Sequence, residues 1–272
     1  MIGYGITSTL DASVVSELAP AVERAGLRTL WVNHPGAEGN ALATMAVAAR
    51  ATTTLRIASG VIPMDLVPAT DVVARVRELD LPTDRLVIGI GAHRPPSPVT
   101  TVREAARTIT DGLGIPVVVG ALGPRMRRIG AREASGILLN WLTPDAAREA
   151  AADRDRDIAA DRGGGRGTGG AGADDSELAL YVRCAFPSAH ERLRQEADKY
   201  AAIPTYAANF ERLGFDAIDS VVLAEDAPAL RTGLEPYARA VDEVVVRAVT
   251  ADDTLAEHLE LVDALAAGPD GA

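Results

Sequence analysis

The sequence predicts an α/β fold, a single (β/α)8 barrel over residues 1–272, and three observations lead to this prediction. Eight short apolar segments alternate with segments of helical periodicity along the chain. The apolar segments are rich in Val, Ile and Leu, which is typical of parallel strands covered on both faces. No second hydrophobic core is predicted, so one domain accounts for the length.

An open doubly wound sheet is the alternative fold. Its usual dinucleotide fingerprint is incomplete here, because Gly89-Ile90-Gly91 lacks the third glycine and follows the fourth strand. The barrel is therefore the preferred prediction. The expected strands are Ile2–Ile6, Thr29–Val32, Leu55–Ser59, Leu86–Ile90, Val117–Val119, Ile137–Trp141, Leu178–Cys184 and Glu243–Val249.

Helical segments separate these strands, and local signals mark several of their ends. Gly26 ends the first helix, and apolar residues at the i, i+3, i+4, i+7 spacing define the face of the second. Only about one helix fits between Gly91 and Pro116, so the crossover between the fourth and fifth strands is expected to be short. Thr250 and Asp253 resemble a capping box before the last helix. The other expected helices start near Pro68, Pro124 and Pro144, include Val102–Ile109, and span His190–Ala201 and Pro204–Leu213.

The Gly-rich stretch GGGRGTGGAGADD, residues 163–175, has two interpretations. One is a loop that cradles a phosphate. The other is a flexible connector at the bottom of the barrel, and we favour it because the stretch precedes a strand instead of following one.

Composition excludes several classes of function. The formal net charge of −11 argues against nucleic acid as a partner. Cys184 is the sole cysteine, so no intramolecular disulfide can form. No HExxH motif, paired cysteine ligands or carboxylate cluster predicts a metal site, and no GxSxG motif predicts a serine nucleophile. No apolar run approaches the roughly 20 residues that span a bilayer, and no leader is recognised, so a soluble, cytoplasmic protein is expected.

The segment from Val117 to Pro144 contains two successive strand-to-helix turns. Gly120-Ala121-Leu122-Gly123 permits a sharp turn, and Pro124 suits the first position of a helix. Backbone N–H groups at such a helix start bind anions, and Arg125 adds a positive charge. In a (β/α)8 barrel the functional residues lie at the C-terminal ends of the strands, so this turn is a candidate binding site.

Polar residues follow several other expected strands. His34 and His93 lie at strand ends, where a histidine can donate a proton or simply be an exposed loop residue. Arg183 and Arg247 end the seventh and eighth strands, where a phosphate often binds; the alternative is an ion pair with a carboxylate such as Asp65 or Asp242. Trp141 could stack on a planar ring or close the core.

Several segments together resemble the luciferase-like monooxygenase family of flavin- or deazaflavin-dependent (coenzyme F420) oxidoreductases. The resemblance covers most of the chain, in the order AVERAGLRTLWVNHPG, ASGVIPMDLVPA, RLVIGIGAH, VGALGPRM, GILLNWLTP, EADKYAAIPTYAANFERLGF and VDEVVVRAV. The resemblance implies a (β/α)8 barrel and a non-proline cis peptide bond between Gly60 and Val61, behind the cofactor ring. It also implies a cofactor phosphate near Gly120–Arg125.

The same resemblance implies roles for the strand-end residues. His34 keeps the second position of a pair that is Asp-His in deazaflavin enzymes, and Asn33 replaces the Asp. The acidic residue that some of those enzymes place after the fourth strand falls near Arg94. His34 is the expected catalytic residue. The residues expected to bind the cofactor are Asn33, Gly60, Val61, Gly91, Gly120, Ala121, Leu122, Gly123, Pro124, Arg125, Asn140, Trp141, Arg183 and Arg247.

The function expected from the resemblance is an oxidoreductase or monooxygenase that acts on a small organic substrate with F420, or alternatively FMN, and forms a homodimer. A bound cofactor performs the redox chemistry in such enzymes, which fits the lack of a nucleophile motif. The alternative is a non-catalytic barrel that binds a flavin-type ligand, which the replaced Asp and the short fourth crossover favour.

Overall fold

Eight strands close a parallel barrel in the computed structural model, which describes residues 1–36, 39–92, 97–163 and 176–266. The strand order is β10-β1-β2-β3-β5-β6-β7-β8, and pairing between β10 and β8 completes the ring. This confirms the predicted (β/α)8 barrel. The barrel strands are β1 (Ile2–Thr7), β2 (Thr29–Asn33), β3 (Arg56–Ser59), β5 (Leu86–Gly91), β6 (Val117–Gly120), β7 (Gly136–Asn140), β8 (Glu177–Ala185) and β10 (Glu243–Ala248).

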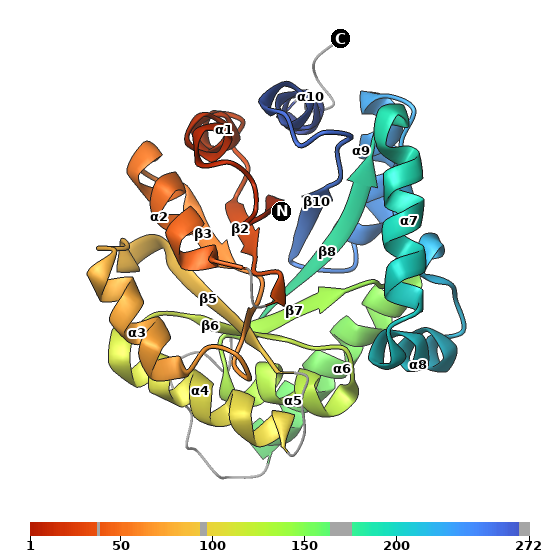
Figure 1. Ribbon diagram of the computed structural model, residues 1–272. Coiled ribbons are helices and arrows are strands. Elements are labelled where there is room, and N and C mark those ends of the chain that lie inside the picture. The colour runs from red at the N-terminus through yellow and green to blue at the C-terminus, as the bar shows by residue number, and fades with distance from the viewer. Residues whose placement is uncertain (37–38, 93–96, 164–175, 267–272) are drawn as a thin grey trace.

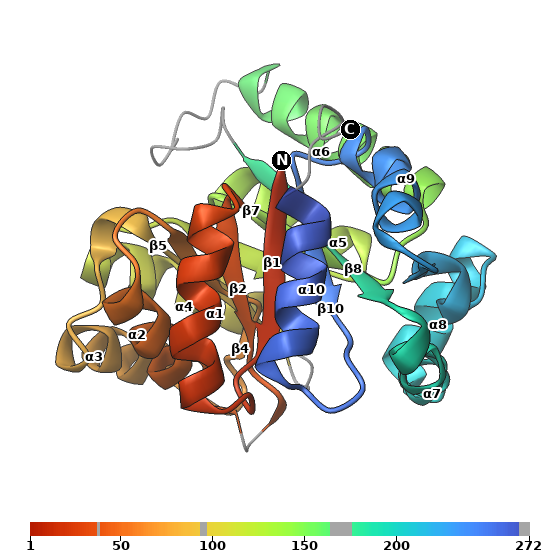
Figure 2. The ribbon, with the colours of Figure 1, turned by 90° about the horizontal axis from the view of Figure 1, so that it is seen from above.

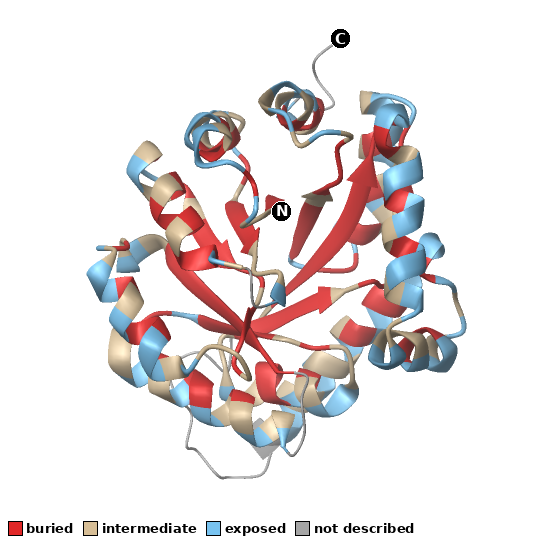
Figure 3. Cartoon of the chain, viewed as in Figure 1, coloured by how far each residue is buried: buried red, intermediate tan, exposed pale blue. Residues whose placement is uncertain are grey.

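Helices surround the barrel and bury their apolar faces against it (Figure 1, Figure 3). α1 and α10 pack side by side outside β1 (Figure 2). A single described helix, α4, connects β5 to β6, which confirms the short fourth crossover. The helices are α1 (Ala12–Arg24), α2 (Ala41–Ala51), α3 (Ala69–Glu78), α4 (Pro98–Leu113), α5 (Pro124–Glu133), α6 (Pro144–Gly163), α7 (His190–Ala201), α8 (Pro204–Leu213), α9 (Ala227–Ala238) and α10 (Leu255–Ala266).

Three details differ from the sequence predictions or fall outside them. Two additional strands of two residues each, β4 (Ile62–Pro63) and β9 (Val222–Leu223), are too short to produce an alternating pattern. The capping box of α10 is one turn later than predicted: Thr254 Oγ1 accepts the N–H of Glu257, and the Glu257 carboxylate accepts the N–H of Thr254. The Gly-rich segment lies, after Gly163, outside the described residues.

The barrel encloses its own small core, separate from the larger one between strands and helices. Side chains at alternate positions of the strands point inward, including Trp31, Val87, Val118 and Val245. Tyr181 joins them from β8, with its ring edge-on to Trp31 at 6.3 Å between centroids. These side chains fill the barrel, so any ligand must bind above them, at one mouth.

The N-terminal mouth is closed by four charged side chains. Glu177 accepts two hydrogen bonds from Arg56, at 2.8 and 3.0 Å, and pairs with Arg28. Glu243 is fully buried beneath them and accepts a hydrogen bond from Trp31 Nε1 at 3.0 Å. Burial raises the pKa of Glu243, and the neighbouring Glu177 carboxylate raises it further. Arg28 and Arg56 lie farther from Glu243, at 3.4 and 3.6 Å, than from Glu177, and they hold the pKa of Glu177 below its ordinary value.

His258 makes stability depend on pH. Its side chain is only 2% exposed in α10, and its Nδ1 lies 3.0 Å from Tyr4 Oη. Burial lowers the pKa of His258 from 6.5, although the nearby Asp253 and Glu257 carboxylates oppose this and Arg247 and Arg192 reinforce it. The folded state thus favours the neutral imidazole. The stability that this preference contributes is fully present above about pH 6.5 and is lost as the pH falls through the lowered pKa.

We expect urea unfolding of the wild type to show a loss of stability between about pH 7 and pH 5 that the His258→Gln variant shows to a smaller extent. The difference should be at most about 1.4 kcal/mol for each unit by which the pKa is lowered. An equally steep loss in both proteins would contradict this assignment.

Within the described ranges, no helix is long and apolar enough to cross a membrane. Among the same residues, no three His, Cys, Asp or Glu side chains are grouped so as to hold a metal ion.

Candidate functional site

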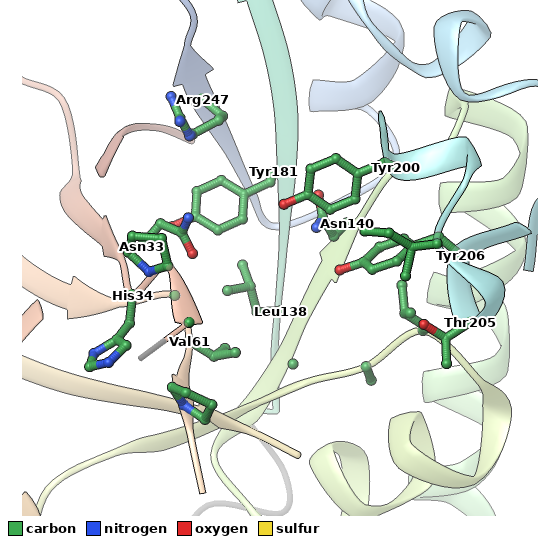
Figure 4. A pocket seen from close by; sticks show the side chains of 18 of the residues that line it. Asn33, His34, Val61, Leu138, Asn140, Tyr181, Tyr200, Thr205, Tyr206 and Arg247 are labelled. Carbon is green, nitrogen blue, oxygen red and sulfur yellow. The ribbon is translucent and has the colours of Figure 1, made fainter. Parts of the chain in front are cut away.

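A cavity of about 460 Å³ opens at the C-terminal ends of the strands, opposite the charged mouth. Its walls come from residues of β7, β8 and β10, from the segments at the ends of β2, β3, β4 and β6, and from α7 and α8 (Figure 4). Ten of the predicted site residues line it: Asn33, His34, Gly60, Val61, Gly120, Ala121, Leu122, Asn140, Arg183 and Arg247. The barrel therefore brings together residues that lie more than 200 positions apart in the chain.

Five other predicted residues, Gly91, Gly123, Pro124, Arg125 and Trp141, lie outside this lining. Gly123 and Pro124 form the start of α5, and Arg125 is exposed on its first turn. His93 and Arg94, two further strand-end candidates, lie outside the described residues.

Val61 projects into the cavity from a bulge between β3 and β4. The Gly60–Val61 peptide bond is cis, as the family resemblance predicted. Gly91 and Gly120 flank the Val61 side chain: a Cβ atom on either glycine would lie only 2.9 Å from a Val61 methyl group. Gly91 thus makes room for Val61, and Gly120 both makes room for it and lines the cavity. Together the two glycines leave a closely fitting space for the Val61 side chain at this mouth of the barrel.

Tyr181 forms part of the floor of the cavity, and sequence reasoning missed it. The side chain is 6% exposed, and its Oη has no hydrogen-bond partner among the described residues. A Cβ on Gly60 would lie 2.4 Å from this Oη, and a Cβ on Gly5 would lie 2.8 Å from the ring, so both glycines are needed for its placement. Burial raises the pKa of Tyr181 well above its ordinary value, so the hydroxyl is a neutral donor.

The alternation of side chains along β8 could have revealed Tyr181. Arg183 was predicted to face the cavity, and a residue two positions earlier on a strand faces the same side. The tyrosine was overlooked because an aromatic residue inside an apolar strand is more often part of the core.

Arg183 is held in place by other side chains. Its Nε donates to Glu196 Oε1 at 2.7 Å, and one terminal nitrogen donates to Asn140 Oδ1 at 2.6 Å. The guanidinium also lies over the Trp141 ring, 3.7 Å from its centroid. Burial raises the pKa of Glu196, but the charges of Arg183 and Arg247 lower it more. The pKa therefore lies below its ordinary value, and the carboxylate is charged. Of the two interpretations, the ion pair describes Arg183, with Glu196 of α7 as the partner.

Trp141 lies behind Arg183 instead of facing the cavity. Its side chain is 1% exposed and packs against Ala197, Phe210 and Ala217. The core interpretation thus describes its position, and its ring serves as the surface on which Arg183 stacks.

Arg247 differs from Arg183 in having no carboxylate partner. Within the described chain, no carboxylate oxygen lies within 4.0 Å of its guanidinium, which donates a hydrogen bond to the backbone oxygen of Ala248. Arg247 and Arg183 are paired in register across β10 and β8. Two positive charges therefore lie side by side on this wall, and Glu196 pairs with one of them.

His34 lies at the rim beside Asn33, where β2 ends, two strand positions from β10 (Figure 4). Its Nδ1 accepts the N–H of Ala41 at 3.4 Å, which leaves the proton on Nε2. Half-burial lowers the pKa of His34, and hydrogen bonding by the Gly36 backbone opposes this. At neutral pH the ring is thus uncharged and able to donate one hydrogen bond.

The remaining wall is aromatic and comes from the helices after β8. Tyr200 and Tyr206 line the cavity with their rings perpendicular, 4.8 Å between centroids. Burial raises the pKa of Tyr206 to about 12. Sequence reasoning treated this segment only as helices, because nothing local shows which face of α7 or α8 turns toward the mouth.

Comparison with known proteins connects this geometry with a family. A family model described as luciferase-like monooxygenase matches residues 89–268. Comparison with curated protein sequences found no match.

Solved structures share the fold at low identity. A coenzyme F420-dependent tetrahydromethanopterin reductase from Methanopyrus kandleri matches with a TM-score of 0.71 and 16% identity, covering 96% of each chain. An F420-dependent secondary alcohol dehydrogenase matches with a TM-score of 0.72 and 14% identity, over 97% of this chain and 98% of that one. The oxygenating constituent of 3,6-diketocamphane monooxygenase from Pseudomonas putida, solved with FMN, matches with a TM-score of 0.64 and 12% identity, over 98% and 96%.

Proposed function

Because the chain belongs to the luciferase-like monooxygenase family, we propose that it is an oxidoreductase that binds coenzyme F420, or alternatively FMN, and acts on a small organic molecule. The observation that supports this most is the Val61 bulge. An apolar side chain is fixed by Gly91 and Gly120 at the centre of a cavity at the functional end of the barrel. Such a flat apolar support fits a planar ring.

The residues of the cavity fit such a cofactor in three respects. Val61 and Leu138 offer apolar contact to a ring, and Asn140 in the lining offers a polar side chain beside it. The turn Gly120–Leu122, at the end of β6, would hold the phosphate with backbone N–H groups. We favour F420 because the ALGPRM and LLNWLTP segments resemble those of the deazaflavin enzymes.

Bound in this cavity, the cofactor would supply hydride transfer or, for FMN, oxygen activation. The protein's part is to orient the reactants and exclude water. His34, a neutral imidazole at the rim, is the proposed catalytic donor. Asn33, in the place of a carboxylate, would contribute a hydrogen bond without charge.

A second candidate is a non-catalytic barrel that binds the same ligand. Asn33 in place of Asp, together with the single helix of the β5–β6 crossover, favours it. Both candidates predict binding, so turnover of substrate by the loaded protein distinguishes them.

Equilibrium titration of the purified protein with F420 and, separately, with FMN tests the proposal. We expect one of them to bind with micromolar affinity or better. Val61→Asp, which places an anion beneath the ring, should weaken binding at least tenfold, or about 1.4 kcal/mol. Ile218→Asp, an equivalent change at an exposed site away from the cavity, should have no effect.

Circular dichroism of both variants shows whether the fold is retained. Failure of either cofactor to bind the wild type at high micromolar concentration would overturn the proposal.

A further inference from the structure

Two side chains on the β8–β10 wall of the cavity have donor capacity that the described chain leaves unused: Tyr181 has no acceptor, and Arg247 donates only to the backbone oxygen of Ala248. The Tyr181 hydroxyl is nine-tenths buried, faces Gly60 at the floor and has no partner among the described residues. Arg247 lines the same cavity and has no carboxylate within ion-pair distance in the described chain. A half-buried guanidinium without an anion is unfavourable, and ligand binding would relieve this.

The strand register places these two donors on one surface. Tyr181 pairs with Val245 and Arg183 with Arg247, so Tyr181 and Arg247 are diagonal neighbours on the inner face of β8 and β10. Such neighbours lie about 7–8 Å apart at their Cα atoms, close enough for both side chains to reach one small group. Figure 4 shows Tyr181 between Arg247 and Val61.

No carboxylate in the described chain forms an ion pair with Arg247, although the charge of Arg247 contributes to the lowered pKa of Glu196. Glu196, the adjacent carboxylate, pairs with Arg183 at 2.7 Å. Arg192, also close to Glu196, pairs with Asp253. Asp65 also lines the cavity, but on the side away from Arg247. It follows β4, which pairs with β5, and β5 is four strand positions from β10 around the barrel. The wall at Arg247 therefore has an excess of positive charge.

The cofactor phosphate is expected elsewhere. The Gly120–Leu122 turn follows β6, which is three strand positions from β10 in a ring of eight, and each step is about 4.8 Å. A phosphate at that turn is thus about 14 Å from β10 along the barrel wall, beyond the length of one side chain. The charge of Arg247 is then available for a second anion.

We propose that Tyr181 and Arg247 together bind the carboxylate of the substrate, so that the substrate is a small organic acid with an apolar body. This inference rests on the proposed function, because it assigns the cofactor phosphate to the β6 turn. Arg247 supplies the charge, and Tyr181 supplies one neutral hydrogen bond. The rings of Tyr200 and Tyr206 on the neighbouring wall fit the apolar body. Arg183, fixed by Glu196 and Asn140, maintains the shape of the wall.

Isothermal titration of the cofactor-saturated protein with benzoate and with neutral benzamide tests this inference. The wild type should bind benzoate at least tenfold more tightly than benzamide. Arg247→Gln should abolish the preference, Arg247→Lys should retain part of it, and Tyr181→Phe should reduce benzoate affinity several-fold. Arg239→Gln, at an exposed arginine directly after α9, is the matched control and should behave as the wild type. Equal affinities for the two probes in the wild type would overturn the inference.

A second titration separates a substrate anion from the cofactor phosphate. FMN is compared with riboflavin, or F420 with its phosphate-free form, in the wild type and in Arg247→Gln. We expect the substitution to leave the contribution of the phosphate unchanged. A selective loss of affinity for the phosphorylated form would place the cofactor phosphate at Arg247 and overturn the substrate assignment.

If neither cofactor binds the wild type, the proposed function fails by itself. The benzoate preference of the cofactor-free protein then decides whether Tyr181 and Arg247 form an anion site.

Discussion

Glu177→Gln should lower the free energy of unfolding by about 3 kcal/mol, because it removes the anion that two arginines share at the closed mouth of the barrel. Arg56 and Arg28 both contact the Glu177 carboxylate, and burial alone would raise the pKa of Glu177. The two arginines, however, lower that pKa below its ordinary value, so the folded state holds Glu177 as an anion. A neutral amide would leave both guanidinium groups with Glu243 alone as a nearby carboxyl group, at 3.4 Å from Arg28 and 3.6 Å from Arg56.

Glu243→Gln is the matched control and should cost less than about 1 kcal/mol. The raised pKa of Glu243 means that its anion is stabilised less than that of Glu177, and the amide of glutamine has the same shape. Its oxygen can still accept the hydrogen bond from Trp31 Nε1. Urea unfolding of the two variants at neutral pH measures the difference. A larger loss of stability for Glu243→Gln than for Glu177→Gln would show that the arginines depend on the charge of Glu243 more than on that of Glu177.

Gly120→Ala should weaken cofactor binding about tenfold or more, whereas Gly123→Ala, three residues later in the same turn, should leave it unchanged. A Cβ on Gly120 would lie 2.9 Å from a Val61 methyl group, so the Val61 side chain would have to shift from its position. A Cβ on Gly123 would meet no atom within 4 Å. Crowding of this kind typically costs about 1–3 kcal/mol, and 1.4 kcal/mol corresponds to a factor of ten in affinity.

Fluorescence titration with whichever cofactor the wild type binds measures both variants, and their thermal unfolding shows whether the barrel is intact. Equal weakening by the two substitutions would mean that the turn acts through backbone flexibility and not through Val61. Unchanged binding in Gly120→Ala would mean that the position of Val61 is unimportant for the ligand.

The sequence by itself determined the order of strands and helices and the end of the barrel at which the site lies. Both follow from local information: apolar runs and helical periodicity define the elements, and in a parallel barrel every strand end faces the same mouth. Asn33, Val61, Gly120 and Arg183 were placed at the cavity for this reason. The cis bond at Gly60–Val61 followed from the family resemblance.

Tertiary structure decided which side chains meet, because pairing depends on how the strands are staggered around the closed barrel. The partner of Arg183 is Glu196, on a helix whose orientation no local pattern gives. Tyr181 reaches the cavity only because Gly5 on β1 and Gly60 in the bulge after β3 leave space for it.

The predictions for Arg125 and Trp141 were limited for the same reason. Their positions at strand ends suggested ligand contact, but the direction of each side chain depends on the helix that follows: Arg125 is exposed on α5, and Trp141 turns into the core. Arg247 lacks a carboxylate partner in the described structure only because the stagger places Glu196 within reach of its neighbour. The sequence thus predicts which residues lie at the C-terminal ends of the strands, and closure of the barrel determines which of them contact one another.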